Sequence, residues 1–238
     1  MLRIDFVTLF PDMVLNAARH SMLLRAEQDG IVEFAATDPR TFTTDNHRTV
    51  DDKPYGGGPG MLMIPEPLFA ALNKLQLEKG TAVVVPDPTG QVYNQNHAQE
   101  LSQKKRVVFL CGHYEGIDER VIEKFATHRF SMGDYVLTGG ELPALTIADS
   151  VVRLLPGVLG CEGSLGIDSH SDGLLSAPQY TRPESYAELA VPEVLKSGNH
   201  GAIETWKRKK ALMLTRENRP DLFCRARLER KDLELLSS

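Results

Sequence analysis

Thr81-Ala82-Val83-Val84-Val85 is a short run of small and β-branched residues, and Arg106-Val107-Val108-Phe109-Leu110-Cys111 is a second run of the same kind. Neither run alternates polar with apolar residues, a pattern typical of strands buried on both faces of a sheet. Residues 2–9 and 31–37 predict two further strands. Amphipathic segments separate these runs, so we expect an α/β layer around a mostly parallel sheet. The helices are expected at 12–28 with Asp12 as the cap, from Pro65 or Pro67 to Gly80, and at 96–104, 116–125 and 142–155.

The composition is that of an ordinary globular protein. The chain has 238 residues, 42% hydrophobic and 25% charged, which excludes collagen-like, mucin-like and wholly disordered proteins. Its three cysteines lie far apart, which excludes a disulfide framework and a CxxC zinc site. No secretory signal or membrane span is expected, and the composition fits a reducing cytoplasm.

The charge of the chain is unevenly distributed. Residues 196–238 hold 11 Lys/Arg and 6 Asp/Glu, a balance of +5, whereas residues 1–195 carry −10. The segment 158–176 is rich in Gly and Ser and predicts a linker or loop. Helices are expected at 202–216 and 225–236. A basic helical module after an acidic α/β domain indicates an anionic partner, with a merely solvated helix face as the alternative.

Four glycine-rich loops follow or flank the predicted strands, at 55–60, 86–90, 111–116 and 138–141. Ligands of open α/β sheets bind beyond the carboxyl ends of the strands, and glycine lets the backbone approach a ligand closely. None of these loops is a G-x-G-x-x-G or P-loop sequence. They therefore favour a pocket lined by backbone over a phosphate cradle or a dinucleotide site.

Longer motifs in the same regions carry a resemblance. His47-Arg48-Thr49-Val50-Asp51-Asp52-Lys53-Pro54-Tyr55-Gly56-Gly57-Gly58-Pro59-Gly60-Met61, Tyr114-Glu115-Gly116-Ile117-Asp118-Glu119-Arg120, Gly133-Asp134-Tyr135-Val136-Leu137-Thr138-Gly139-Gly140-Glu141-Leu142-Pro143 and Tyr180-Thr181-Arg182-Pro183 stand in this order. Together they resemble the bacterial tRNA (guanine-N1)-methyltransferase family of TrmD type, in the SPOUT superfamily. The resemblance covers nearly the whole chain.

The resemblance implies a SPOUT-type α/β fold whose mostly parallel sheet ends in a C-terminal trefoil knot, an exception to the rule against knots, followed by a small all-α domain. Residues 1–160 would bind S-adenosylmethionine, 161–176 would be a flexible linker carrying the catalytic aspartate, and 177–238 would bind tRNA. The implied reaction transfers a methyl group to N1 of guanosine 37, beside the anticodon. The implied partners are the tRNA anticodon stem-loop and a second copy of the chain, in a cytoplasmic homodimer with shared active sites.

The resemblance also implies roles for particular residues. Asp168 would be the general base on N1–H and Arg153 would stabilise O6, with Asp172 as the rival base. From the residues alone, a solvated turn aspartate and a helix-end surface arginine are the alternatives. Glu115 would take part in binding Mg²⁺. A lone carboxylate is nevertheless a poor site for this cation, which takes several oxygen ligands.

The remaining implied contacts are with the methyl donor and the tRNA. The tRNA would contact Lys207, Arg208, Lys209 and Lys210. Two departures from the family's pattern are His113, where many members carry arginine, and the loop 85–90, where an aromatic-Leu-Ser-Pro pattern is usual. A buried strand is the alternative for 135–137. The donor would contact Pro86, Gly112, Tyr114, Met132, Gly133, Asp134, Tyr135, Val136, Leu137, Gly139, Gly140 and Pro143.

Two other functions remain open at the level of sequence. One is a SPOUT enzyme that methylates another RNA base or a ribose 2′-oxygen, which would need no acceptor for the N1 proton. The other is a non-catalytic RNA-binding homologue that keeps the fold.

Overall fold

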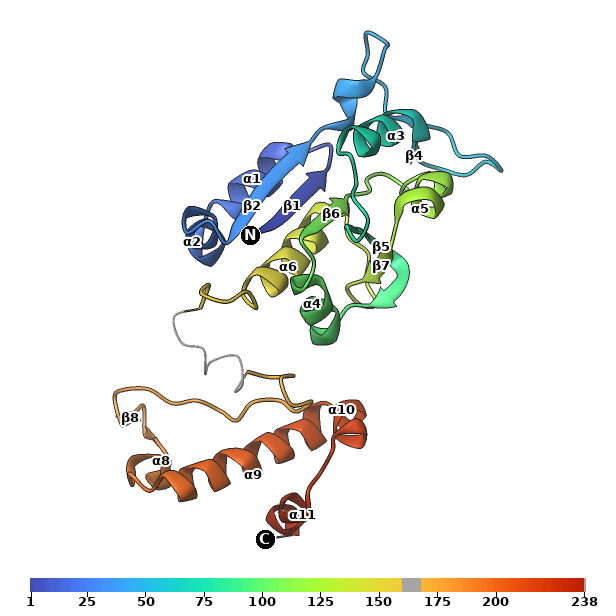
Figure 1. The fold of residues 1–238 in the computed structure, drawn as a ribbon. Helices are drawn as coiled ribbons and strands as arrows, with labels where there is room; N and C mark the ends of the chain where they lie inside the picture. The colour runs from blue at the N-terminus through green and yellow to red at the C-terminus, as the bar shows by residue number, and fades with distance from the viewer. Residues whose placement is uncertain (160–167, 238) are drawn as a thin grey trace. The chain divides into compact units, whose positions relative to one another are not determined.

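A five-stranded parallel sheet forms the centre of the first of two units, Met1–Gly160 and Cys161–Ser238 (Figure 1). The computed structural model describes residues 1–159 and 168–237. The strand order is β2-β1-β6-β5-β7 and all neighbours run parallel, which confirms the mostly parallel α/β sheet. The strands are β1 (Leu2–Val7), β2 (Val32–Thr37), β5 (Ala82–Val92), β6 (Arg106–Leu110) and β7 (His128–Ser131).

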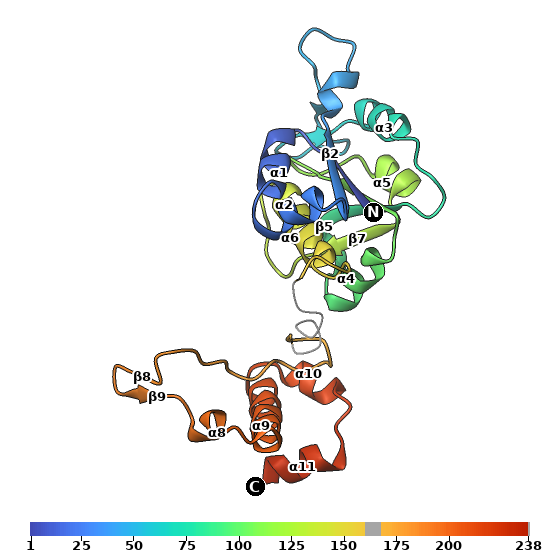
Figure 2. The same ribbon diagram turned by 60° about the vertical axis from the view of Figure 1, so that its left-hand side comes forward.

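Helices cover both faces of this sheet, which explains why its central strands are apolar throughout. Ala82 and Val84 of β5 pack into one hydrophobic cluster, whereas Val83 and Val85 pack into the other. Figure 2 shows α1, α2 and α6 on one side of the sheet and α3 and α5 on the other. The first cluster is built with α1 (Pro11–Ala18), α2 (Ser21–Gln28), α4 (Gln95–Ser102) and α6 (Glu141–Val152), and the second with α3 (Pro65–Lys74) and α5 (Glu119–Phe125).

The single helix predicted over 12–28 is wrong. The chain leaves the first helix at Arg19 and enters the second at Ser21, whose φ of 52° is incompatible with a continuous helix. Asp12 also does not cap, because Pro11 occupies the first turn one residue earlier and Asp12 then lies inside that turn.

The strand predicted at 81–85 continues to Val92, so the glycine-rich loop at 86–90 lies within β5. Both Pro86 and Gln91 pair with Phe130 of β7, and the residues between them form a large bulge. Gly90 lies so close to the backbone of Arg129 that a Cβ there would overlap it. Strand β7 was not predicted, since His128 and Arg129 give it no apolar run.

The other predicted elements of the first unit occur with shifted ends. Helix α5 begins after Asp118 and not at the predicted residue 116, because Gly116 has a φ of 122°, which is outside the helical region. The Asp118 carboxylate caps the helix by accepting a hydrogen bond from the Arg120 N–H. Asn94 caps α4. The remaining short elements are η1 (Pro39–Phe42), β3 (Asp51–Asp52) and β4 (Leu62–Met63).

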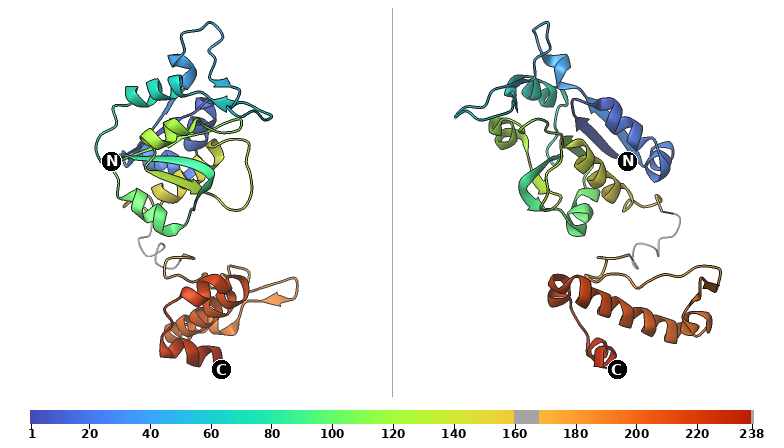
Figure 3. Two further views of the ribbon diagram at one scale, coloured as in Figure 1. Left: turned by 90° about the vertical axis from the view of Figure 1, so that its right-hand side faces the viewer. Right: turned by 180° about the vertical axis from the view of Figure 1, so that it is seen from behind.

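The second unit is built on one long helix, α9 (His200–Asn218), against which the neighbouring helices pack. In Figure 3 it is the long helix of the orange-to-red part of the chain. The predicted last helix at 225–236 occurs as α11 (Arg230–Ser237), which begins five residues later, and α10 (Pro220–Arg225) before it was not predicted. The described part of the chain contains no helix that is both long and apolar enough to cross a membrane. The other elements are β8 (Ser185–Tyr186), β9 (Leu189–Ala190) and α8 (Glu193–Lys196).

Candidate functional site

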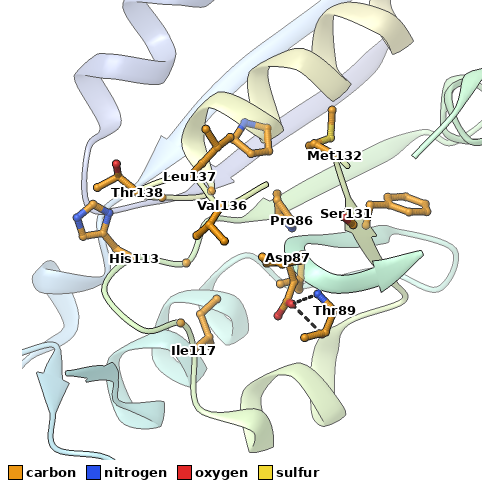
Figure 4. A pocket seen from close by; sticks show the side chains of 18 of the residues that line it. Pro86, Asp87, Thr89, His113, Ile117, Ser131, Met132, Val136, Leu137 and Thr138 are labelled. Carbon is orange, nitrogen blue, oxygen red and sulfur yellow. Dashed lines mark hydrogen bonds between the residues drawn. The ribbon is translucent and has the colours of Figure 1, made fainter. Parts of the chain in front are cut away.

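A cavity of about 360 Å³ opens where the bulge of β5 meets the loops that follow β6 and β7 (Figure 4). This is the carboxyl-terminal side of the parallel strands, where open α/β sheets bind ligands. Its volume falls within the range of small-molecule sites. The cavity is lined by Val85, Pro86, Asp87, Pro88, Thr89, Gly112, His113, Tyr114, Glu115, Gly116, Ile117, Ile122, Phe130, Ser131, Met132, Tyr135, Val136, Leu137, Thr138, Gly139, Gly140 and Pro143.

Backbone contacts hold two of these loops together. The Gly140 N–H donates to the Gly112 carbonyl over 2.8 Å, and His113 forms an isolated bridge with Gly139. A Cβ on Gly140 would lie 2.9 Å from Cys111 Cα and 3.0 Å from Gly112 N. Because Gly140 has an ordinary φ of −79°, glycine is required there for space and not for conformation.

Behind the loops lies a buried polar pair. Glu141, 3% exposed, accepts a hydrogen bond from Thr8 Oγ1 over 2.7 Å, and Thr8 Oγ1 accepts one from the Phe10 N–H. Burial and the nearby Glu141 carboxylate both raise the pKa of the Cys111 thiol well above its ordinary value. Cys111 therefore stays protonated and is not a nucleophile.

The cavity is acidic. The described residues that line it include two acidic residues, Asp87 and Glu115, but no Lys or Arg. Asp87 Oδ1 accepts hydrogen bonds from both Thr89 N and Thr89 Oγ1 over 2.7 Å. Asp87 forms a long ion pair of 3.9 Å with Arg129, whose guanidinium donates to both carboxylate oxygens of Glu119 over the shorter distance of 2.7 Å. The site is therefore suited to a ligand with positive charge.

Most of the residues predicted to contact a methyl donor line this cavity, but Gly133 and Asp134 do not. Tyr135, Val136 and Leu137 are 57%, 82% and 41% exposed, so the buried-strand alternative for them is wrong. Their contact with a donor stays a prediction. Several lining residues were missed, among them Asp87 and Thr89 within a loop already noted for its glycine, and Phe130 and Ser131 on the unpredicted strand β7.

The fit of Glu115 to a metal ion is poor. Its N–H donates to the Met61 carbonyl over 2.9 Å, and its side chain packs so closely on Gly60 that a Cβ there would overlap it. Among the residues the structure describes, no three His, Cys, Asp or Glu side chains gather where they could hold a metal. Divalent hard cations need several oxygen ligands, so the described residues around Glu115 do not fit Mg²⁺.

The two predicted catalytic residues belong to different units. Arg153 is the C-cap of α6, half-buried, with its N–H bonded to the Asp149 carbonyl over 3.1 Å. Asp168 begins the described part of the second unit, and its carbonyl accepts a hydrogen bond from the Ser171 N–H over 3.2 Å. Their action on one substrate stays a prediction.

The four predicted tRNA contacts lie on α9, but they differ in surroundings. Arg208 forms ion pairs with Asp172 and Asp232. Lys207 is exposed, and the ammonium of Lys210 lies 5.9 Å from the ring centroid of Trp206. Asp172, the rival base, is thus one of the two aspartates whose carboxylates face Arg208.

Comparison with known proteins gives one consistent result. The family described as tRNA (Guanine-1)-methyltransferase TrmD matches residues 2–225. A Staphylococcus epidermidis protein named tRNA (guanine-N(1)-)-methyltransferase is 48% identical over 237 residues, which is 100% of this chain and 97% of the relative. A Dictyoglomus turgidum protein of the same name is 50% identical over 236 residues, 99% of this chain and 96% of the relative. The chain belongs to the TrmD family of tRNA (guanine-1)-methyltransferases.

Proposed function

We propose that this chain transfers a methyl group from S-adenosylmethionine to N1 of guanosine 37 in tRNA, in the cytoplasm. The observation that carries the proposal is the acidic, glycine-lined cavity at the carboxyl ends of the strands in a chain of this family. S-adenosylmethionine supplies a methyl group on a positively charged sulfur. The Asp87 carboxylate would favour that charge. Gly112 and Gly139 line the cavity without a side chain and would let the nucleoside approach the backbone.

The protein's chemical task is to make guanine N1 nucleophilic. N1 carries a proton at neutral pH, and negative charge moves onto O6 as that proton leaves. In the proposed mechanism Asp168 accepts the proton and the Arg153 guanidinium stabilises the charge on O6. The cavity would hold the methyl group in line with N1, so that the transfer is effectively unimolecular and S-adenosylhomocysteine leaves.

The proposal includes a homodimer with active sites shared between subunits and a SPOUT fold with a trefoil knot. Exposed apolar side chains beside the cavity support an interface there, since Val136 is 82% exposed and Leu142 is 53% exposed. The knot is proposed from the family to which the chain belongs. The basic helical unit would hold the anticodon stem-loop.

Mass spectrometry of tRNA incubated with the protein and S-adenosylmethionine tests the reaction. We expect 1-methylguanosine at position 37. Asp168→Asn should lose transfer by about a hundredfold or more while keeping donor binding, tRNA binding and folding, because the amide is a far weaker base than a carboxylate. Arg153→Gln should lower the rate constant with a smaller effect on binding.

Three outcomes would contradict separate parts of the proposal. A methyl group on a ribose oxygen would exclude the base reaction, and a product at another guanosine would exclude position 37. Full activity of Asp168→Asn would exclude its role as the base. Tight tRNA binding with no methylated product would instead favour a binding protein.

A further inference from the structure

The segment that carries Asp168 is docked onto helix α9. The Leu175 N–H donates to Thr215 Oγ1 over 2.9 Å, and Thr215 Oγ1 donates to the Ala211 carbonyl one turn earlier over 2.7 Å. Leu174 is 2% exposed and Thr215 is fully buried. The part of this segment around Leu174 and Leu175 therefore packs against the long helix of the second unit.

The same segment is also closed on itself. The His170 N–H donates to the Leu174 carbonyl over 2.7 Å, and the Ser176 N–H donates to Ser169 Oγ over 2.9 Å. Asp172 Oδ1 accepts from the Leu174 N–H over 3.1 Å. These bonds give the residues that follow Asp168 a defined shape.

One guanidinium joins this segment to two helices. Arg208 of α9 donates through Nη1 to Asp172 Oδ2 over 2.7 Å, and through Nε and Nη2 to the two oxygens of Asp232 over 2.8 Å each. Asp232 lies in α11 with its side chain 5% exposed, and it also accepts from the Glu229 N–H over 3.0 Å. The two carboxylates raise the pKa of Arg208, and Arg208 lowers the pKa of Asp232.

These contacts make Arg208 unsuited to the phosphate contact that the basic run implies. Two carboxylates already face its one positive charge. Turning the guanidinium towards a phosphate would leave the buried Asp232 carboxylate unpaired, which is strongly destabilising. Lys207, exposed on the same helix, has no such bond among the described contacts of the unit. Arg208 and Lys207 therefore have different roles.

We propose that Arg208 is a positioning residue that makes the tRNA-holding helix and the segment bearing the catalytic base one rigid piece. This inference rests on the proposed function. When the lysines of α9 hold a tRNA, the position of Asp168 relative to guanine N1 of that tRNA is then fixed. The Asp172–Arg208 ion pair maintains the position of the Asp168 segment relative to α9. Arg208 touches neither the RNA nor the donor.

Asp172→Asn is the cleanest test. The asparagine oxygen still accepts from the Leu174 N–H, so the turn is kept, while the charge facing Arg208 is lost and the Arg208–Asp232 pair stays intact. We expect kcat to fall about tenfold, because small displacements of a catalytic group lower rates strongly. KM for tRNA should change by less than about twofold, and the salt dependence of binding should not change.

Matched variants separate this role from others. Glu204→Gln removes an exposed acid on the same helix and should leave kcat unchanged, which controls for long-range charge. Lys207→Gln should raise KM and reduce the salt slope of binding by about 1, with kcat retained. In a background of Arg208→Gln with Asp232→Asn, which leaves no buried carboxylate unpaired, Asp172→Asn should have no further effect on kcat, because residues that act as one unit are not additive.

The readouts also distinguish failure of this inference from failure of the proposed function. Hydrogen exchange at the amides of His170 and Leu175 should speed up in Asp172→Asn, a measurement that needs no activity. Faster exchange with unchanged kcat would overturn the positioning role. So would a reduced salt slope in Arg208→Gln with Asp232→Asn, which would make Arg208 an RNA ligand. Inactivity of the unaltered protein towards guanosine N1 would instead overturn the proposed function.

Discussion

The two units fix their functional loops by different physical means. In the first unit, glycine backbone packs on glycine backbone, as at Gly140 and Gly112, and the charged groups lie around the cavity. In the second unit a charged network between Arg208 and two aspartates holds the segment. The glycine packing of the first unit should be insensitive to pH but should be disrupted by one added methyl group. The ion pairs of the second unit should be sensitive to pH, whereas that unit should tolerate an added methyl group.

Gly140→Ala should have the largest effect, because its Cβ would overlap backbone that cannot yield. Overpacking of this kind destabilises by about 1–3 kcal/mol, and the two loops would have to separate. We expect loss of S-adenosylmethionine binding by about a hundredfold, the equivalent of some 2.7 kcal/mol. Titration calorimetry of the donor measures it.

The matched control lies in the second unit. Gly201, in the first turn of α9, has only Asn199 Oδ1 within 4 Å of the added Cβ, at an ordinary 3.7 Å. Gly201→Ala should stabilise by about 0.5–1 kcal/mol, since alanine is the better helix former. Equal losses of donor affinity in both variants would show that backbone packing at the cavity is not what holds the donor.

The contrast also explains what the sequence could reveal. The motifs around Gly112 and Gly140 located the cavity because short strands and glycine loops are local patterns. The bulge between Pro86 and Gln91 was missed, because a strand that continues through two prolines contradicts local preferences. The burial of Glu141 depends on Thr8, 133 residues away, and no local pattern reports such a partner.

The same limit accounts for Arg208. Within Lys207 to Lys210 it looks like one more basic residue, and only the fold brings Asp172 and Asp232 to it, from 36 and 24 residues away. An arginine in a basic run is typical of RNA binding, whereas the contacts of Arg208 join three segments of the second unit to one another. For Asp168 and Arg153 the family resemblance was needed, because neither a turn aspartate nor a helix-end arginine marks a catalytic group.

The network in the second unit should make that unit sensitive to acid. Arg208 lowers the pKa of Asp232, so the pair stabilises the folded unit above the ordinary aspartate pKa, and this stability is lost as pH falls through the lowered folded pKa. We expect the free energy of unfolding to decline below about pH 4. Fluorescence of Trp206, the single tryptophan of the chain, reports this unit during urea titrations.

Asp232→Asn tests the source of that sensitivity. It should lower stability at neutral pH by about 1.5–3 kcal/mol, the contribution of a hydrogen bond to a charged group, and flatten the decline in acid. Asp221→Asn is the control. Arg219 also lowers the pKa of Asp221, to about 2, but this pair lies at the exposed surface, where solvent screening leaves it little effect on stability. An undiminished acid decline in Asp232→Asn would assign it to other carboxylates.

The smallest predicted effect concerns charge at the cavity, where two aspartates give opposite expectations. Asp134 belongs to the motif predicted to bind the donor, yet only Asp87 is among the lining residues. Asp87→Asn keeps the oxygen that accepts from Thr89 and removes the charge. We expect it to weaken S-adenosylmethionine binding by about three- to tenfold, and S-adenosylhomocysteine, which lacks the positive sulfur, by less. Asp134→Asn should change neither affinity by more than about twofold, because an exposed charge is screened by solvent.

An equal loss for both ligands in Asp87→Asn would mean that Asp87 acts as a hydrogen-bond acceptor for the nucleoside. A loss in Asp134→Asn alone would mean that the loop after β7 closes over the bound donor and brings that carboxylate to it.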